Sequence, residues 1–257
     1  MNAREQFIAF MTILVKEIRR YTRIWTQTLL PSAITMSLYF VIFGSLIGSR
    51  IGEMGGFTYM QFVVPGLIMM SIVTNSYSNV VSSFFGAKFN NSVEELLVSP
   101  TPNYIILLGY VLGGVSRGIL VAIVVTLVSG FFTNFHIHSY LVVIAIVLMT
   151  STLFALAGFI NAVYANSFDD ISIVPTFILT PLIYLGGVFY SMDLLPEFWA
   201  NVSKLNPLVY VVNAFRYGVL GVSDVSLPFA FGMITLFTVA AFCFSMHLLN
   251  SGKRLRQ

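Results

Sequence analysis

The sequence predicts an all-α membrane protein with six transmembrane helices, and two observations indicate this fold class. Of the 257 residues, 57% are hydrophobic and only 9% are charged, whereas a soluble domain carries roughly 25% charged residues. Three windows, at residues 25–49, 54–87 and 118–168, contain no Asp, Glu, Lys or Arg. A crossing needs ~20 apolar residues, so these windows hold about four helices before the C-terminal third is counted. Residues 1–257 are therefore predicted to form a single transmembrane domain.

Residues 4–23 are predicted to form an amphipathic helix at the membrane interface. Apolar side chains recur at helical spacing along one side, at Phe7, Met11, Leu14, Ile18 and Tyr21. The segment also carries five basic and two acidic residues, a balance that suits the headgroup layer of an anionic leaflet.

The first two transmembrane helices, predicted at residues 25–48 and 59–85, each carry a row of polar side chains. The row of the first helix is Thr28, Ser32, Thr35 and Tyr39. The row of the second is Ser71, Asn75, Ser78 and Ser82, with Asn79 beside it. Polar groups in hydrocarbon are costly without a partner or water. The rows therefore indicate either a path through the membrane or the packing of helices through Ser and Thr.

A polar segment at residues 88–102 separates the second and third transmembrane helices. Ser92 followed by Glu95 is the pattern of a capping box, which predicts a short helix that begins at Ser92 and is ended by Pro100 and Pro102. The candidate contact residues of this helix are Ser92, Val93, Glu94, Glu95, Leu96 and Leu97. Its apolar flank is typical of a docking helix, and a solvated connector between membrane helices is the alternative interpretation.

The third and fourth transmembrane helices are predicted at residues 104–132 and 140–164. The third has glycines at spacings that allow close helix approach, at Gly109, Gly113, Gly114 and Gly118. Arg117 lies among them, and a guanidinium inside a bilayer is expected to face protein, most simply in a structural ion pair. His136 and His138, in the loop between the two helices, lack a third ligand nearby and are interpreted as surface residues.

The fifth transmembrane helix is predicted at residues 171–190, with Ser167 and Asp170 capping its start. The pair Asp169–Asp170 suggests acid–base chemistry at first, but adjacent residues diverge on a helix, which favours a capping role. The polar row of this helix is Ser172, Thr176, Thr180 and Tyr184. Residues 191–227 are predicted to form a re-entrant or interfacial segment with short helices at 196–204 and 207–217, before a sixth transmembrane helix at 228–250.

The distribution of basic residues predicts the orientation. If both termini are cytoplasmic, nine Lys and Arg residues lie on the cytoplasmic side, and three, Arg50, Lys204 and Arg216, lie on the other. This asymmetry obeys the positive-inside rule and places the 88–102 segment in the cytoplasm. The net charge of +3 follows from topology, and no nucleic-acid partner is expected.

Motifs that would give the chain its own chemistry are absent from the sequence. It has no G-x-x-x-x-G-K-[ST] phosphate loop, no H-E-x-x-H and no G-x-S-x-G. The single cysteine, Cys243, excludes a disulfide framework and a Cys-rich metal site. We therefore expect no catalytic, cofactor or metal site, and any transport must draw its energy from a partner.

The order of elements and two motifs resemble the ABC-2 type permeases, the membrane subunits of bacterial ABC exporters. Residues 85–100, FGAKFNNSVEELLVSP, are similar to the Glu-Leu-Leu segment of that family, which is followed by proline. Residues 205–221, LNPLVYVVNAFRYGVLG, are similar to its C-terminal signature of Asn-Pro, an aromatic residue and Phe-Arg-Tyr. The resemblance covers nearly the whole chain.

The resemblance implies a multi-pass permease in the bacterial inner membrane, with two copies of the chain bound to two copies of a separate ATPase. The helix at residues 92–100 would be the coupling helix, and the 165–170 turn, with Asp169 and Asp170, would be a smaller contact with the ATPase. Helices one, two and five would line the path at the homodimer interface. The candidate path residues are then the first two polar rows together with Thr176, Thr180 and Tyr184.

The sequence thus predicts the permease subunit of an ATP-driven exporter. Two alternatives are a membrane-embedded lipid-modifying enzyme, which would need a buried acid, base or nucleophile, and a non-transporting scaffold, which would not need three polar rows. Aromatic residues near the far side suit a lipid- or sugar-linked cargo and equally an ordinary interfacial belt, so the cargo is left open.

Overall fold

The computed structural model describes residues 1–134 and 137–252, and these form an almost entirely helical bundle. The first part contains α1 (Ala3–Arg23), α2 (Trp25–Thr28), α3 (Leu30–Val41), the π-helical η1 (Ile42–Ile47), α4 (Gly48–Ile51) and the two short strands β1 (Glu53–Met54) and β2 (Phe57–Thr58). The middle contains α5 (Tyr59–Phe89), α6 (Ser92–Val98), α7 (Asn103–Ser129) and α8 (Tyr140–Tyr164). The last part contains α9 (Asp170–Val174), the π-helical η2 (Pro175–Leu179), α10 (Thr180–Tyr184), the 3₁₀ turn η3 (Met192–Leu194), α11 (Glu197–Ser203), α12 (Pro207–Leu220) and α13 (Leu227–Ser251).

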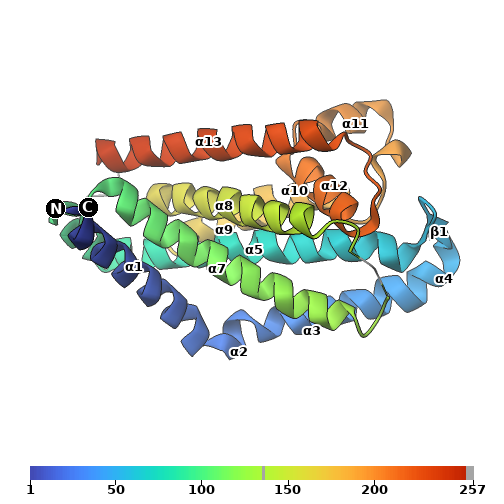
Figure 1. The fold of residues 1–257 in the computed structure, drawn as a ribbon, viewed down its shortest axis with the longest axis horizontal. Helices are drawn as coiled ribbons and strands as arrows, with labels where there is room; N and C mark the ends of the chain where they lie inside the picture. Colours follow the sequence, from blue (N-terminus) through green and yellow to red (C-terminus); the bar gives the residue numbers. More distant parts are fainter. Residues whose placement is uncertain (135–136, 253–257) are drawn as a thin grey trace.

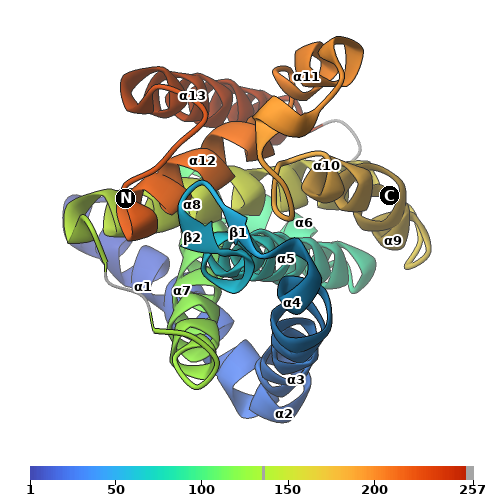
Figure 2. The ribbon, with the colours of Figure 1, turned by 90° about the vertical axis from the view of Figure 1, so that its right-hand side faces the viewer.

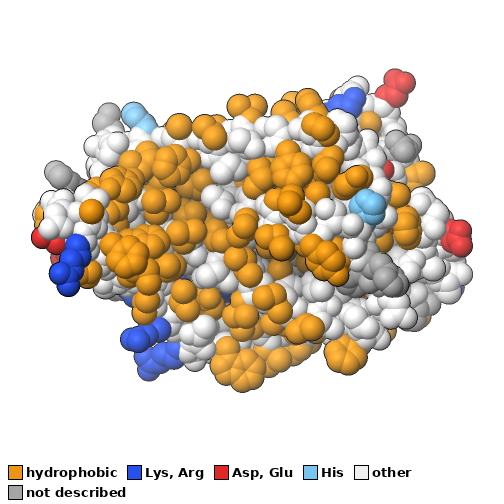
Figure 3. Space-filling model, in the orientation of Figure 1, with side chains coloured by type: hydrophobic (Ala, Val, Ile, Leu, Met, Phe, Trp, Pro, Cys, Tyr) orange, Lys and Arg blue, Asp and Glu red, His pale blue; other side chains and the backbone are white. Residues whose placement is uncertain are grey.

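The long helices run back and forth along one axis, so that the bundle has two distinct ends (Figure 1). The start of α1 and the end of α13 lie at one end, which we call the terminal end. The antiparallel β1–β2 hairpin and α11 lie at the other, which we call the hairpin end. Charged side chains gather toward the two ends of the face drawn in Figure 3, and hydrophobic side chains cover the band between them. That distribution is the one expected of a bundle whose middle lies in hydrocarbon.

Helix α5 is the centre of the bundle, and α7 and α8 pack along it. Viewed from the hairpin end, α3 and the α9–α10 segment flank α5 on one side (Figure 2). The predicted glycine contacts of α7 are present, because a Cβ at Gly114 would lie 2.6 Å from a methyl of Val80 and 3.0 Å from Ala155. Close approach of the backbones thus replaces large side chains at the centre, as in other membrane bundles.

We expect Gly158→Ala to destabilise the bundle markedly, because a Cβ at Gly158 in α8 would lie 2.5 Å from the carbonyl oxygen of Tyr77 in α5. The backbone of Tyr77 cannot move aside as a flexible side chain would. Overpacking of this kind typically lowers the free energy of unfolding by about 1–3 kcal/mol. Gly232→Ala in α13 is the matched control, since no atom lies within 4 Å of its Cβ position. Thermal unfolding in detergent should separate the two variants, and equal melting temperatures would contradict this packing.

Four helices are long and apolar enough to cross a membrane among the described residues. They are Trp25–Ile51, which joins α2, α3, η1 and α4, and then Asn103–Ser129, Tyr140–Tyr164 and Leu227–Ser251. The other two predicted crossings also exist as helical segments: α5, of 31 residues, lies at the predicted place, and Asp170–Tyr184 is a shorter apolar helix. The structure therefore supports an all-α membrane protein, and a six-crossing topology stays a prediction.

The fifth predicted helix is shorter than the sequence indicated, and this expectation was wrong in detail. The helix ends at Tyr184 instead of residue 190, because the chain turns at Gly187, which adopts φ +74°. That left-handed conformation is readily available to glycine alone. Pro175 begins a π-helical stretch in the same helix, so the helix is irregular as well as short.

The N-terminal helix packs on α7 through residues that lie, except for Tyr21, outside the predicted apolar stripe. Ile13, Glu17 and Tyr21 are its buried residues, and Ile13 and Glu17 lie against Gly109 and Gly113 of α7. The predicted apolar stripe is split, since Tyr21 is buried while Phe7 is 62% exposed. A fully buried carboxylate at position 17 is the feature that a hydrophobic pattern does not reveal.

Candidate functional site

Helix α6 projects at the terminal end between α5 and α7 and carries an apolar surface. Val93 is 2% exposed and anchors the helix to the core, and Leu96 and Leu97 are half-buried against it. Val98, in contrast, is 83% exposed. The helix thus divides its apolar residues between holding itself in place and facing outward.

The predicted start of α6 at Ser92 is confirmed, but the predicted capping box is wrong. The residue before the helix is Asn91, in a left-handed conformation with φ +59°, and no side chain caps the helix. Glu95 is therefore an exposed carboxylate rather than a cap. At its other end the helix stops at Ser99, directly before Pro100. The Ser99 hydroxyl donates to the carbonyl of Leu96 and accepts from the amide of Thr101.

Lys88 joins the end of α5 to the loop between α8 and α9. Its Nζ donates to the carbonyl oxygens of Val163 and Ala165, at 2.8 Å in each case, and its side chain is 3% exposed. A cation at the last carbonyls of a helix satisfies acceptors that have no partner within the helix. Lys88 is one of the nine basic residues counted on the cytoplasmic side. The structure shows that it is buried and links α5 to the loop between α8 and α9.

Aromatic side chains make a second link between the same two segments. The Phe168 ring lies 5.0 Å from the rings of both Phe85 and Phe89, measured between centroids. Phe89 and Phe168 are each about half exposed, at 52% and 54%. Neither residue was predicted as part of a site, although each is an aromatic residue within a polar segment, at residues 88–102 and 165–170.

These contacts bring the two predicted coupling segments to one surface. We define the docking surface as the exposed residues Phe89, Glu95, Val98, Phe168 and Asp169. It combines apolar side chains with two carboxylates at the terminal end of the bundle. Capping explains the neighbouring Asp170 as predicted, since its carboxylate accepts from the amides of Asn166 and Ser167 and its own amide donates to Ser167 Oγ.

Polar side chains predicted to line a path form, in part, a network between helices. Arg117 donates to Asn75 Oδ1 at 2.9 Å and to the Thr28 carbonyl at 3.4 Å. Asn75 Nδ2 in turn donates to Ser32 Oγ at 3.0 Å. The predicted ion pair of Arg117 is therefore wrong: within the described residues its partners are an amide and a carbonyl. The network joins the Trp25–Ile51 helix, α5 and α7.

A second polar cluster joins α1 to α5. Glu17 accepts a 2.6 Å hydrogen bond from Ser83 Oγ and forms a 3.4 Å ion pair with Arg20. Arg20 also donates to the carbonyl and the side-chain oxygen of Asn79 and to Ser82 Oγ. Charged partners of this kind hold an interfacial helix firmly against the bundle.

The twelve candidate path residues differ in exposure. Four are buried, three are half-buried and five are exposed: Thr28, Ser71, Asn75 and Asn79; then Ser32, Tyr39 and Ser78; then Thr35, Ser82, Thr176, Thr180 and Tyr184. Several bond their own helix, as Ser71 does to the Leu67 carbonyl. The buried members are thus engaged in packing within the chain, and the exposed members stay candidates for the path.

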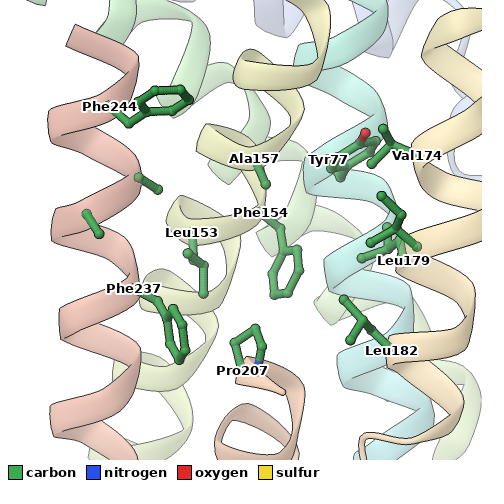
Figure 4. Close-up of a pocket in the computed structure, with 13 residues that line it drawn as sticks. Tyr77, Leu153, Phe154, Ala157, Val174, Leu179, Leu182, Pro207, Phe237 and Phe244 are labelled. Atoms are coloured by element: carbon green, nitrogen blue, oxygen red, sulfur yellow. The ribbon is translucent and has the colours of Figure 1, made fainter. Parts of the chain in front are cut away.

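The apolar hollow shown in Figure 4 lies between α13 and the α9–α10 segment, with α8 and α5 behind it. Its volume is about 420 Å³, and Phe154, Leu182 and Phe237 are among the side chains that line it. The lining presents no charged or reactive group, so the hollow is suited to contact with hydrocarbon and not to catalysis.

No group of three or more His, Cys, Asp or Glu side chains that could hold a metal ion occurs among the described residues. His136 lies outside the described residues, and His138 is exposed beside the Tyr217 ring at 5.4 Å. Glu17 and Arg216 are also buried charges. Arg216 lies inside α12, close to the short helix predicted at residues 207–217, and its burial was not expected of one of the three basic residues counted on the far side.

The chain is similar to known transport proteins along most of its length. Residues 8–220 match the ABC-2 type transporter family. The inner membrane transport permease YadH of Escherichia coli K12 is 57% identical over 250 residues, which cover 97% of this chain and 98% of that protein. Nodulation protein J of Neorhizobium galegae is 23% identical over 240 residues, covering 92% and 90%. Nodulation protein J of Rhizobium leguminosarum bv. viciae is 22% identical over 214 residues, covering 83% of each chain.

Proposed function

The chain belongs to the ABC-2 type transporter family, and from that premise we propose that it is the permease subunit of an ATP-driven exporter. It is a multi-pass inner-membrane transport subunit and not an enzyme, in keeping with its relatives. The finer proposal is that two copies form the path and that a separate ATPase, also in two copies, supplies the energy.

The docking surface is the observation that carries the proposal. It lies at one end of the bundle, is joined to α5 through Lys88 and Phe168, and exposes Val98 almost completely. The contacts of Lys88 and Phe168 would transmit a push on the α8–α9 loop to the central helix, and the buried Val93 would transmit a push on α6 to the core. Large exposed apolar side chains outside the bilayer indicate contact with another protein.

The orientation and the six crossings remain part of the proposal. We infer that α5 and the Asp170–Tyr184 helix also cross the bilayer, because the ribbon passes from end to end between consecutive loops (Figure 1). Lys88 and Arg216 are buried and are left out of the count of basic residues. The cytoplasmic side then has eight Lys and Arg residues (nine minus one), and the opposite side has two (three minus one). The asymmetry still favours cytoplasmic termini.

Cysteine labelling tests this topology, in a Cys243→Ser background. Glu53→Cys, in the exposed hairpin, should react with an impermeant thiol reagent added to intact cells, whereas Ser92→Cys and Ser251→Cys should react only after the membrane is permeabilised. Glu53 and Ser251 are both exposed in the fold, so a difference between them reports the membrane. Labelling of Ser92→Cys from outside would overturn the six-crossing topology.

An assay of the reconstituted complex tests the function itself. The purified permease and its ATPase, incorporated together in proteoliposomes, should hydrolyse ATP faster when cargo is present, whereas the ATPase alone should not respond. A lipid-modifying enzyme would instead convert lipid without ATP, and a scaffold would do neither. The three outcomes are distinguishable in one preparation.

A further inference from the structure

Arg216 in α12 is a fully buried cation with few partners. Its Nη2 atom donates a 2.6 Å hydrogen bond to the carbonyl of Gly187, and its guanidinium carbon lies 3.8 Å from the centroid of the Phe62 ring. The other two guanidinium nitrogens have no hydrogen-bond partner among the described residues. Burying a charge is costly unless it is well paired. Stability therefore does not explain why a buried arginine occupies position 216.

Arg216 holds the turn at residues 186–189, which follows α10. Gly187 is in the left-handed conformation, with φ +74°. On its other side the turn rests on α5, where a Cβ at Gly66 would lie 2.6 Å from the Val188 carbonyl oxygen. The Tyr59 hydroxyl also donates to the Phe189 carbonyl at 3.2 Å. The turn is thus fixed between α12 and α5.

Phe189 leaves this turn and joins the two helical segments that flank α5. Its ring centroid lies 4.8 Å from that of Phe43, 5.8 Å from Tyr184 and 6.3 Å from Tyr39. Tyr39 and Phe43 come from α3 and η1, and Tyr184 comes from α10. We call these four rings the aromatic bridge. It joins the α3–η1 segment to α10, two segments that lie to one side of α5 in Figure 2.

Both flanking segments contain a π-helical stretch next to the aromatic bridge. These are Ile42–Ile47, which begins directly after α3, and Pro175–Leu179, which precedes α10. π-helical turns are rare and are frequent at functional sites. Both segments joined by the bridge therefore carry a feature typical of such sites.

We propose that Arg216 is a positioning residue for transport, which holds the 186–189 turn so that Phe189 keeps the aromatic bridge closed in the resting permease. The proposal rests on the transport function given above. The planar guanidinium suits this task because it stacks on Phe62 and donates in one fixed direction at the same time. Opening the path at the hairpin end would then require the turn to leave Arg216 or to move with α12.

The accessibility of Thr180 tests this proposal. Thr180 is exposed and lies one helical turn before Tyr184 on the same face of α10, so the proposal has the closed bridge lie between Thr180 and the hairpin end. Thr180→Cys, in the Cys243→Ser background, is combined with Arg216→Met, Arg216→Lys or Phe189→Ala. Phe198→Ala is the matched control, because Phe198 is 68% exposed at the same end and pairs only with Trp199 among the ring contacts. Labelling by an impermeant reagent from the hairpin-end side and the melting temperature are both measured.

Arg216→Met is expected to speed the labelling of Thr180→Cys about tenfold, the effect of losing one hydrogen bond to a charged group. Phe189→Ala removes the ring that joins the two sides of the aromatic bridge and should speed the labelling at least as much. Arg216→Lys should lie between them and the parent, and Phe198→Ala should match the parent. A lower melting temperature with an unchanged labelling rate in the Arg216 variants would overturn the proposal and leave Arg216 a packing residue. An unchanged rate in Phe189→Ala would overturn the role of the bridge. Neither result would affect ATPase binding, which tests the proposed function separately.

Discussion

Val98→Asp is expected to abolish ATPase binding while the permease remains folded and inserted. Val98 is 83% exposed, so the substitution removes nothing from the core of the chain. In a complex the same side chain would be buried: its apolar contact is worth roughly 1.5–3 kcal/mol, and an unpaired carboxylate there adds a further cost. Together these predict a loss of affinity of at least about a hundredfold.

Co-purification of the ATPase and ATP hydrolysis in proteoliposomes measure this effect. Leu205→Asp is the matched control, because Leu205 is 79% exposed in the segment between α11 and α12, at the hairpin end. Leu97→Asp is a less selective test, since Leu97 is half-buried against the core and its loss would disturb α6 itself. Normal binding and normal coupled transport in Val98→Asp would refute the role of the docking surface.

Asn75→Leu is expected to lower the stability of the permease, by roughly 1.5–3 kcal/mol, because it removes the hydrogen bond that Asn75 accepts from Arg117 and leaves that guanidinium without its best partner. The polar row alone makes Asn75 a candidate path residue, whose replacement would be expected to change transport without weakening assembly with the ATPase. The buried network changes that expectation, since Asn75 is 7% exposed and bonds two other helices.

Two further substitutions make the Asn75→Leu test selective. Ser32→Ala removes the other side-chain contact of Asn75 and should cost about 0.5–1.5 kcal/mol. Ser71→Ala removes a hydroxyl that bonds only its own helix and should be nearly neutral. Thermal unfolding in one detergent ranks the three variants. If Asn75→Leu were as stable as Ser71→Ala yet defective in transport, Asn75 would belong to the path after all.

The sequence predicts the bounds of a helix where these are set by the length of an apolar run. The fourth helix was expected at residues 140–164 and is Tyr140–Tyr164, because a long apolar run bounded by polar residues has one stable form in a membrane. The start of α6 at Ser92 was also expected. The end of the fifth helix was not, because it depends on how the Gly187 turn is held by Arg216 and Gly66, which are distant in sequence.

The candidate site was predictable in part for the same reason. The residues of α6 could be named from their pattern, and so could Asp169 and Asp170. Lys88 could not, since a lysine beside a polar loop looks like an ordinary surface charge until the carbonyls of Val163 and Ala165 are seen around it. Polar rows gave a similar difficulty. Spacing shows that Thr28 and Asn75 share a face with other polar residues, but only the fold shows that the Asn75 side chain accepts from Arg117 and that the Thr28 hydroxyl donates to the Tyr21 carbonyl.

Site-specific photo-cross-linking at Val98 tests the central proposal most directly. A photoreactive amino acid replaces Val98 in intact cells, with the same replacement at Leu205 as the control, and cross-linked proteins are identified by mass spectrometry. Coupling to an ATPase through the docking surface predicts an adduct between the Val98 position and an ABC-type ATPase, with no such adduct from the Leu205 position. Adducts from Val98 that contain lipid or a second copy of this chain, and no ATPase, would contradict it.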